Sequence, residues 1–566
     1  MTVHAIRACV DPKVIQTVTR LFNQTEGDIA AEMLQNARRA GATRVIVSTT
    51  QLSHDRACLR ISDNGRGIDD PAKLLRLGAS GWDDETLRRE DPAGMGVFSL
   101  AGRKVDVSSR AGTAMGWSAH IDEGDWTSGH EIAIHSCVRS PGTTFAIEMS
   151  AGRLEDARKA IATAARHYPV DVELNGEIIE RQDFLANATH IEIWNGLRIG
   201  VFTDNRGAWR RTPSINFHGL TVHHGLPTIA EIDSDRQWCA KVHVIDCPAL
   251  QLTLPARKEV VVSPFIDELA AAVRSAIYTA IALQGEHRLS YENWCEAAVL
   301  GIILPNAKQG LRLFKPRVYD DSLSSDYEPP VTVGNNLVLI DDLEAAEEQS
   351  LARALIVSRD AIAGTLVRSE PAFKGYDWYD RLRQVESLRF IVKQGTAIYV
   401  DTLGGDLINL ADRQVDAIAA ELTIITESLP QVHQLNTDLL LQPDENYDLD
   451  GASIAVVKGG IAGAEPLTPA ILAEYLDNAY FCHSDDSNCD SFDTQLRYWQ
   501  KDSRHLAVRT LLGDDEAVSD SILQAFLDSV AWLVPQGNRL WLHHEKGETT
   551  ISLEPAAADP AAPPVA

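Results

Sequence analysis

Several common sequence signatures are missing from this chain of 566 residues. Its eight cysteines form no CxxC pair, which excludes a disulfide framework and the usual zinc modules, so we expect reduced thiols. No run of about 18 apolar residues is present to span a bilayer. The first residues, MTVHAIRACVDPK, lack the long apolar segment of a signal peptide. We therefore expect a cytoplasmic protein without membrane contact.

Positive charge is scarce and unevenly distributed. The chain has 52 Lys and Arg against 80 Asp and Glu, a formal net charge of −28. Residues 1–150 hold 17 basic against 19 acidic side chains, residues 151–315 hold 18 against 19, and residues 316–566 hold 17 against 42. So acidic a surface argues against nonspecific binding of nucleic acid by the whole protein, although a local basic groove is not excluded.

The length predicts three or four folded units, and the pattern divides the chain near residue 168. Before that point, helices within 12–40 and 153–166 flank several strands, which indicates an α/β unit, residues 1–168, with one face of its sheet covered. Those strands are predicted at 43–52, 57–63, 103–110, 115–121, 130–137 and 143–149.

Residues 169–315 are predicted to form a second, α+β unit. It begins with a hairpin at 170–179, where Asn175-Gly176 is a strong turn signal. Strands follow within 191–204 and 240–247, and then a long helix at 263–284.

The acidic remainder is harder to interpret. The polar, proline-ended stretch around 319–330 predicts an acidic linker, residues 316–334. Residues 335–553 mix helical and extended patterns and are predicted to be an acidic α/β region of unknown fold. The Pro/Ala-rich end, residues 554–566, predicts a disordered tail.

Two motifs in the first unit combine carboxylate and amide groups with glycines. Glu32 and Asn36 lie four apart on a predicted helix, so both project from one face and could hold a water and a metal ion side by side. Asp63 ends a predicted strand, where its carboxylate can accept a hydrogen bond from an exocyclic amine such as that of adenine. Gly65 and Gly67 then let the backbone, including Ile68, pass close to a ligand.

Two further motifs follow in the same unit. The residues Gly94, Met95, Gly96, Val97 and Phe98 predict a glycine turn that opens a short helix, whose free N–H groups suit a phosphate. The chain has no GxxxxGK[ST] phosphate loop. Thr143 follows Gly142 at the start of a strand, where its hydroxyl could reach a base. Each motif alone is typical of an ordinary helix face, turn or strand, whereas their order and spacing favour one site.

In that order, over residues 26–149, the chain resembles the GHKL ATPases, which share the Bergerat nucleotide fold: gyrase B subunits, a heat-shock chaperone, histidine kinases and MutL proteins. The resemblance implies ATP and Mg²⁺ as cofactors. Glu32 would be the general base that orients the attacking water, and Asn36 would hold magnesium. Asp63 would bind the adenine amine, supported by Thr143 through water.

The same resemblance assigns the glycine-rich segments. Gly65 and Gly67 would shape the base pocket, which also contains Ile68 of the same motif. The five residues from Gly94 to Phe98 would donate N–H groups to the phosphates. Residues 69–93 would form the ATP lid, with Gly78, Gly81 and Gly94 as hinges.

Residues 252–281 look like the transducer domain of MutL, in which a lysine reaches the γ-phosphate. By position after Pro255 the match is Arg257, and by chemistry it is Lys258, so both are candidates. The resemblance implies a homodimer that closes as a clamp on ATP binding, with about the first 12 residues exchanged between protomers.

Other branches of the superfamily fit less well. Only about 25 residues precede the Glu32 helix, which leaves no room for the phospho-acceptor helices of a histidine kinase. Asp448 and Asp450 have DxD spacing, but no glutamate motif precedes them as in a TOPRIM domain, and the MutL endonuclease signature is missing. A type IIB topoisomerase B subunit is not excluded.

The sequence therefore predicts a magnesium-dependent ATPase that acts as a dimeric clamp, with the acidic C-terminal half recruiting a protein client or partner. One alternative is a DNA-processing subunit, motivated by the transducer-like segment and the basic cluster Arg206, Arg210 and Arg211. The other is a non-hydrolysing module in which ATP only orders an interaction surface.

Overall fold

The computed structural model describes residues 25–74, 96–128, 130–205, 212–253, 257–319, 336–359, 361–402, 410, 413–425, 429–443, 449, 452–482 and 491–555. The chain divides into two compact units, Met1–Lys308 and Gln309–Ala566, each with its own architecture. Several predicted features lie outside the described residues: the N-terminal exchange segment, lid residues 75–93, Gly94, Met95, Arg206, Arg210, Arg211, Asp448, Asp450 and residues 556–566.

The first sheet of unit 1 has eight strands in the order β5-β4-β3-β6-β2-β1-β7-β8. All neighbours are antiparallel except β1 and β7, which are parallel, so the sheet is mixed. Its strands are β1 (Arg44–Gln51), β2 (Arg56–Asp63), β3 (Val105–Arg110), β4 (Gly116–Ile121), β5 (Ile134–Cys137), β6 (Gly142–Ser150), β7 (Asp171–Leu174) and β8 (Glu177–Ile178).

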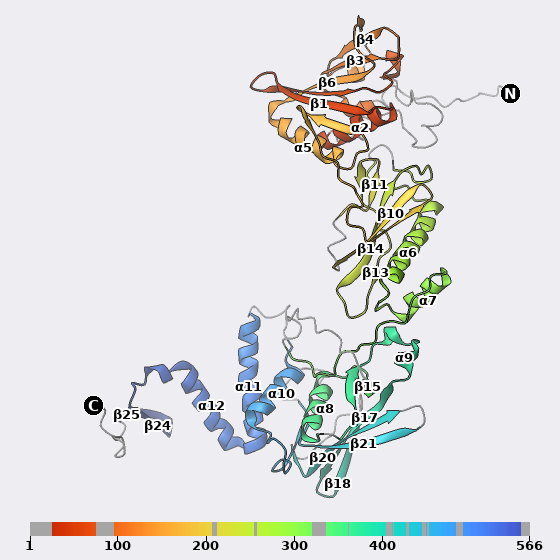
Figure 1. The fold of residues 1–566 in the computed structure, drawn as a ribbon. Helices are drawn as coiled ribbons and strands as arrows, with labels where there is room; N and C mark the ends of the chain where they lie inside the picture. The colour runs from red at the N-terminus through yellow and green to blue at the C-terminus, as the bar shows by residue number, and fades with distance from the viewer. Residues whose placement is uncertain are drawn as a thin grey trace, which may run out of the picture. The chain divides into compact units, whose positions relative to one another are not determined.

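Helices α2 (Glu26–Arg39) and α5 (Leu154–Ala165) pack against each other and cover one face of this sheet (Figure 1). The buried sides of the strands alternate with polar residues, for example Leu59 and Ile61 inward with Arg60 outward, as expected for a sheet covered on one face. Shorter elements complete the layer: α4 (Asp125–Ser128) and the 3₁₀ helices η1 (Pro71–Leu74), η2 (Gly96–Leu100) and η3 (Ala151–Arg153).

A second sheet in unit 1 has the order β12-β11-β14-β10-β9, with β13 beside β14. Helix α6 packs along β9, β10 and β14 and buries one side of itself there (Figure 1). The elements are β9 (His190–Trp194), β10 (Leu197–Asn205), β11 (Ile215–Phe217), β12 (Leu220–Val222), β13 (Ile229–Ala230), β14 (Arg236–Val244), α6 (Pro264–Gln284) and α7 (Tyr291–Val299). Helix α6 begins at Pro264, a residue favoured at the first helical position. It ends before Gly285, whose φ of 76° lies in the left-handed region.

Unit 2 contains a six-stranded mixed sheet, order β16-β15-β17-β20-β21 with β18 beside β17, and a three-stranded sheet, order β19-β23-β22. The strands are β15 (Leu337–Ile340), β16 (Thr365–Arg368), β17 (Arg383–Gln394), β18 (Ala397–Thr402), β19 (Gln414–Val415), β20 (Ala417–Ile425), β21 (Pro430–Thr437), β22 (Leu439–Leu441) and β23 (Ile454–Val457).

Helices pack around these two sheets. They are α8 (Ala345–Val357), α9 (Asp377–Asp380), α10 (Pro469–Tyr480), α11 (Phe492–Leu512) and α12 (Asp514–Ser529), with 3₁₀ helices η5 (Pro371–Phe373) and η6 (Ala531–Leu533). Helix α8 lies between the sheets and α10, held by a buried ion pair in which Arg353 Nε and Nη2 each lie 2.7 Å from an Asp438 oxygen. A separate hairpin, β24 (Asn538–Glu545) and β25 (Glu548–Pro555), ends the described chain.

The mixed α/β architecture agrees with the expected fold class, and the predicted strands of the first unit and its flanking helix are confirmed within a few residues. The Asn175-Gly176 turn is also confirmed, since both residues have positive φ, 52° and 92°. Two boundaries differ. The hairpin β7–β8 joins the first sheet, which therefore extends beyond residue 168, because β7 pairs with β1. Strand β25 extends to Pro555, past the predicted start of the tail at residue 554.

Within the described part of the chain no disulfide joins two cysteines among Cys58, Cys137, Cys239, Cys247, Cys295 and Cys482. Among the described helices, none is both long enough and apolar enough to cross a bilayer.

A buried carboxyl group on α10 makes the stability of unit 2 dependent on pH. Burial raises the pKa of Asp477 from 3.8 to about 6, with a further contribution from Glu474, although the Ser503 hydroxyl donates a hydrogen bond to Asp477 Oδ1 at 2.6 Å. A raised pKa favours the folded state below 3.8, and this advantage is lost as the pH rises through about 6.

We therefore predict that Asp477→Asn, which can still accept the Ser503 hydrogen bond, raises the free energy of unfolding at pH 7.5 by about 1–3 kcal/mol. Below pH 3.8 the gain should vanish. Urea unfolding at both pH values measures this difference, with the exposed Asp502→Asn as control. An equal effect at both pH values would contradict the assigned cause.

Candidate functional site

Helix α2 carries the first predicted pair of functional residues. The Thr25 hydroxyl accepts a hydrogen bond from the Asp28 N–H at 3.1 Å and so caps the helix start, while Arg38 and Arg39 lie in the last turn and complement the helix dipole. Its apolar face, including Ile29 and Met33, is buried on the sheet. The side chains of Glu32 and Asn36 are half-buried at the border of that face.

The start of α2 is fixed by charge. Glu26 is 7% exposed and lies 3.2 Å from Arg103 and 3.0 Å from Arg153, two residues that follow η2 and precede α5. A carboxylate this buried requires such partners, because its desolvation is otherwise unfavourable. The pairs therefore fix the position of the helix that presents Glu32.

Asp63 lies at the end of β2, beside Thr143 on the neighbouring strand β6. The register pairs Ser62 with Thr144, which places Asp63 and Thr143 side by side. Burial raises the pKa of the Asp63 carboxyl, whereas the backbone N–H groups of Gly65 and Thr143 and the charge of Arg139 favour its ionised form. The Gly65 N–H lies 2.8 Å from Asp63 Oδ1.

Two glycines around Asp63 are required by close backbone contacts. A Cβ atom on Gly67 (φ 75°) would lie 2.0 Å from the Arg110 carbonyl oxygen, and one on Gly142 (φ 119°) would lie 2.1 Å from the Asp63 carbonyl oxygen. Neither the space nor the positive φ suits another residue. These contacts hold the backbone of both glycine segments tightly against the ends of the neighbouring strands.

A network of hydroxyl groups joins the same segments. Ser109 Oγ accepts a hydrogen bond from the Ile68 N–H at 2.8 Å, lies 3.0 Å from Thr143 Oγ1 and donates to the Gly142 carbonyl oxygen at 3.1 Å. Thr143 is buried, and its hydroxyl thus faces Ser109. The structure therefore joins Ile68, Ser109 and Thr143 by hydrogen bonds, and Asp63 lies beside Thr143.

The Glu32 and Asp63 regions meet at the end of α2. The Arg66 N–H donates a hydrogen bond to the Ala40 carbonyl oxygen at 2.8 Å, and a Cβ atom on Gly65 would lie 2.7 Å from Ala40 Cβ. The loop that follows Asp63 therefore packs directly on the residue that ends the Glu32 helix.

Gly96 lies against Glu32 from the other side. A Cβ atom on Gly96 would lie 1.7 Å from Glu32 Oε1, so only glycine brings the backbone this close to the carboxylate. Gly96 begins η2, in which Val97 packs against the core and Phe98 is buried. Of the predicted residues in this motif, Gly96 therefore lies against Glu32, and Phe98 is buried in the core.

Two guanidinium groups flank Glu32. Arg39 Nη1 lies 3.8 Å from Glu32 Oε1 and 3.4 Å from Asn36 Oδ1, and its side chain is 1% exposed. Arg257, in the segment before α6, places its Nη1 3.9 Å from Glu32 Oε2, and its side chain is 11% exposed. Lys258, in contrast, is 55% exposed and pairs with Asp28 at 3.4 Å. Of the two basic candidates, Arg257 is the one beside Glu32.

Further contacts tie α2 to the second sheet. Gln35 Nε2 donates a hydrogen bond to the His218 carbonyl oxygen at 2.8 Å, in the turn between β11 and β12. The buried Tyr168 hydroxyl donates to the Leu34 carbonyl oxygen, and Gly219 packs on Tyr168. The helix that carries Glu32 thus contacts the second sheet at several points.

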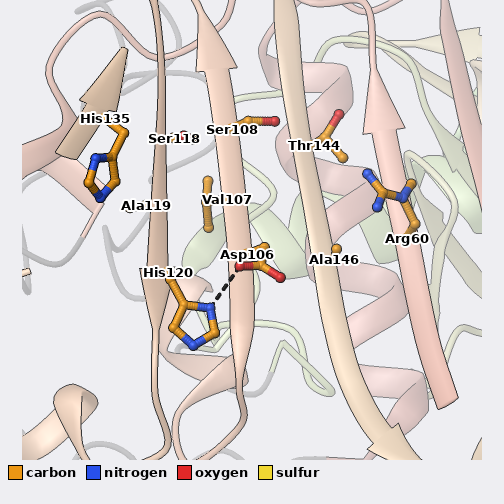
Figure 2. Close-up of a pocket in the computed structure, with 10 residues that line it drawn as sticks. All are labelled: Arg60, Asp106, Val107, Ser108, Ser118, Ala119, His120, His135, Thr144 and Ala146. Atoms are coloured by element: carbon orange, nitrogen blue, oxygen red, sulfur yellow. Dashed lines mark hydrogen bonds and ion pairs between the residues drawn. The ribbon is translucent and has the colours of Figure 1, made fainter. Parts of the chain in front are cut away.

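The opposite face of the first sheet has a shallow hollow of about 190 Å³, shown in Figure 2. It is lined by polar strand residues such as Arg60, Ser118 and His135, and His120 Nδ1 lies 2.7 Å from Asp106, whose hydrogen bond raises the pKa of His120. A nucleotide-sized ligand needs about 300 Å³ or more. The hollow contains none of the predicted site residues, and we assign the site to the α2 face.

The sequence prediction missed Arg39 and Ser109. Arg39 lies three residues after Asn36, so the i, i+3 spacing on the helix could have included it. Ser109 has no such signal, because it reaches Ile68 and Thr143 only through the pairing of β3 with β6. Gly94 and Met95 lie outside the described residues, and their predicted roles remain predictions.

Comparison with known proteins gives a weak structural similarity. No protein-family model matches the chain, and no curated protein matches it. One similar solved structure is the N-terminal domain of a DNA repair protein, with 14% identity over 38% of this chain and 80% of the other, and a TM-score of 0.25. At that score the similarity supports no conclusion about fold or function.

The contact between Gly96 and Glu32 gives a direct test of the site geometry. Gly96→Ala should lower the free energy of unfolding by about 1–3 kcal/mol, because the new methyl group displaces Glu32 or shifts η2. Thermal unfolding measures the change. Gly124→Ala is the matched control, since a Cβ atom there meets nothing within 4 Å. Equal stability of the two variants would show that this contact is not tight.

Proposed function

We propose that unit 1 binds ATP with Mg²⁺ and hydrolyses it, as a GHKL-type ATPase of Bergerat fold that closes as a dimeric clamp on a protein client. One observation carries the proposal: residues from separate motifs converge around α2. Gly96 packs on Glu32, the loop after Asp63 packs on Ala40, and Thr143 lies beside Asp63. Convergence of this kind is what a single ligand site requires.

The Asp63 pocket suits the adenine base. An ionised carboxylate accepts hydrogen bonds from an exocyclic amine; burial raises the pKa of Asp63, and the backbone N–H groups of Gly65 and Thr143 counteract this by favouring the ionised form. The Thr143 hydroxyl, held by Ser109, can join the same hydrogen-bond network.

The donor set near Glu32 is compatible with magnesium and phosphate. Asn36 supplies an amide oxygen, a ligand type that Mg²⁺ accepts alongside phosphate oxygens and water. Arg39 lies 3.4 Å from that oxygen, so a magnesium-bound state requires this contact to open. When bound, Mg²⁺ would neutralise charge on the phosphates. Arg39 and Arg257 supply further positive charge beside the same carboxylate.

Within this proposal Glu32 orients the water that attacks the γ-phosphate and accepts its proton. Hydrolysis of this kind depends on positioning and charge stabilisation and requires no covalent residue. Gly96, at the first position of η2, offers a backbone N–H beside the carboxylate, where phosphate oxygens would be bound.

Arg257 is the better candidate for the basic residue that reaches the γ-phosphate. It approaches Glu32, whereas Lys258 turns to Asp28 at the helix start. Arg257 also has a positive φ of 51°, uncommon for a residue with a side chain, which is typical of positions held in place for function. Arg257 therefore links the second sheet to the proposed catalytic carboxylate.

The first test separates binding from turnover. Glu32→Ala should retain ATP affinity within about 3-fold and lose at least about 100-fold in kcat, because only the water-orienting group is removed. Asp63→Ala should instead lose ATP binding. Calorimetric titration with ATP and a phosphate-release assay measure the two effects.

Matched controls are Glu155→Ala and Asp55→Ala, exposed carboxylates remote from the proposed site, which should behave as wild type. Unchanged hydrolysis by purified Glu32→Ala protein would refute the mechanism. Tight ATP binding by the wild type without phosphate release, even with candidate partners added, would favour the non-hydrolysing module instead.

A second test discriminates the two basic candidates. Arg257→Ala should reduce kcat by about 10- to 100-fold, since it removes charge next to the reacting phosphate. Lys258→Ala should change kcat by less than about 3-fold, because its described contact is with Asp28 and is half-exposed. Steady-state ATPase rates of both variants decide the assignment, and the reverse ranking would transfer the role to Lys258.

A further inference from the structure

The face of the first sheet that α2 and α5 leave uncovered carries a row of hydroxyl side chains. Ser118 of β4 pairs with Ser108 of β3, and Ser108 pairs with Thr144 of β6. Ser62 of β2 follows opposite Thr144, and the two hydroxyl oxygens lie 2.9 Å apart. These residues alternate with neighbours buried in the core, such as Val107 beside Ser108. Four adjacent strands therefore present hydroxyl groups in line on the same face.

The hollow of about 190 Å³ lies over this row because a small residue separates larger ones (Figure 2). In the register, Ala146 of β6 lies between Arg60 of β2 and Asp106 of β3. Its methyl group leaves a space that the longer side chains on both sides border. His120 of β4 and His135 of β5 border the hollow farther along the sheet. This volume can hold a phosphate group, but it is below the roughly 300 Å³ that a nucleotide-sized ligand needs.

Arg60 has no ion-pair partner within the described part of the chain. No hydrogen bond joins its side chain to another described residue either, and Figure 2 shows its guanidinium directed toward β6. Arg56, on the same strand and the same face, differs in this respect, because its Nη1 lies 3.3 Å from Glu148 Oε1. The five N–H donors of Arg60 are therefore available to a ligand in the hollow.

The hydroxyl groups on the floor of the hollow can also donate hydrogen bonds. Arg139, in the loop after β5, donates from Nη1 to Ser108 Oγ at 2.8 Å and from Nη2 to Thr144 Oγ1 at 3.2 Å. A hydroxyl that accepts a hydrogen bond from a guanidinium keeps its own proton to donate. Ser118, half-buried beside Ser108, makes no side-chain hydrogen bond to another described residue. Ser108 and Ser118 therefore present two O–H donors to the hollow.

Asp106 is the acidic side chain among the residues that line the hollow, and it is paired. Its Oδ1 lies 2.7 Å from His120 Nδ1, and this hydrogen bond raises the pKa of His120, which favours the imidazolium form that offsets the charge of Asp106. Asp122 lies 3.5 Å from the other ring nitrogen of His120 and does not line the hollow. With Asp106 offset in this way, Arg60 and Arg139 give the hollow a net positive charge.

We propose that this hollow is a binding site for a phosphate group, taken either as inorganic phosphate or as a small phosphomonoester. The planar guanidinium of Arg60 matches two phosphate oxygens at once. Ser108 and Ser118 donate hydrogen bonds from the floor, and His135 borders the side where a further oxygen or the ester group lies. A tetrahedral oxyanion has enough oxygens for donors that come from several directions, whereas Arg60 would repel a cation. The site lies on the opposite face of the sheet from Glu32 and is independent of the proposed ATPase.

The test is a calorimetric titration of the full chain with inorganic phosphate, without nucleotide and at constant ionic strength. We expect binding with a Kd below about 1 mM. A parallel titration with glycerol phosphate distinguishes the two sources of the phosphate group. Similar affinity would support a phosphomonoester, and affinity weaker by about 10-fold or more would support the free ion. Absence of binding by both ligands up to about 10 mM would overturn the proposal.

Single variants connect the binding to the hollow. Arg60→Gln should raise the phosphate Kd at least about 10-fold, because it removes the charged pair of donors. Ser118→Ala should raise the Kd by about 3- to 10-fold through the loss of one donor. Arg56→Gln is the matched control, since Arg56 is exposed on the same strand and face but is paired with Glu148, and it should change the Kd by less than about 2-fold. Far-UV circular dichroism verifies the fold of each variant.

Three results with the variants would also overturn the proposal. Wild-type affinity in Arg60→Gln would place the phosphate elsewhere. An equal loss in Arg60→Gln and Arg56→Gln would show attraction by the general surface charge. Loss of binding in Arg257→Ala, with Arg60→Gln unaffected, would assign the phosphate to the α2 face. Because no nucleotide is added, none of these results depends on ATP hydrolysis.

Discussion

The contact between Glu32, Gly96 and the two arginines is the interaction on which the proposed site in unit 1 depends. It joins three parts of the chain that are far apart in sequence: the helix α2, the start of η2 and the segment that carries Arg257. A carboxylate in this half-buried position requires cationic partners, since desolvation would otherwise disfavour it. The same positive charge suits phosphate groups. The charges of Arg39 and Arg257 would therefore contribute both to stability and to the proposed chemistry.

Much of unit 1 could be predicted from its sequence, because local signals there agree with the fold. Alternating residues define β1 and β2, and the Asn175-Gly176 turn defines a hairpin. The order of the motifs predicted one site; in the structure Gly96 lies against Glu32 and Thr143 lies beside Asp63, while their roles stay predictions. What the sequence could not supply was non-local geometry, such as the choice of Arg257 over Lys258 at Glu32, or the pairing of β7 with β1.

The fold of unit 2 could not be predicted from its sequence, for physical reasons. Helix α8 buries Glu348 and Arg353 in ion pairs, so its hydrophobic periodicity does not mark its buried faces. Helix α12 exposes its apolar side, which reverses the usual rule. In both cases the residue pattern reflects partners that a single segment does not reveal.

We propose that unit 1 is a magnesium-dependent ATPase. The most direct measurement is steady-state phosphate release by the wild-type chain as a function of ATP, with Mg²⁺ and with the metal chelated. The account predicts turnover that saturates with ATP and disappears on chelation. Absence of phosphate release by the purified chain at saturating ATP, with Mg²⁺ present, would contradict it.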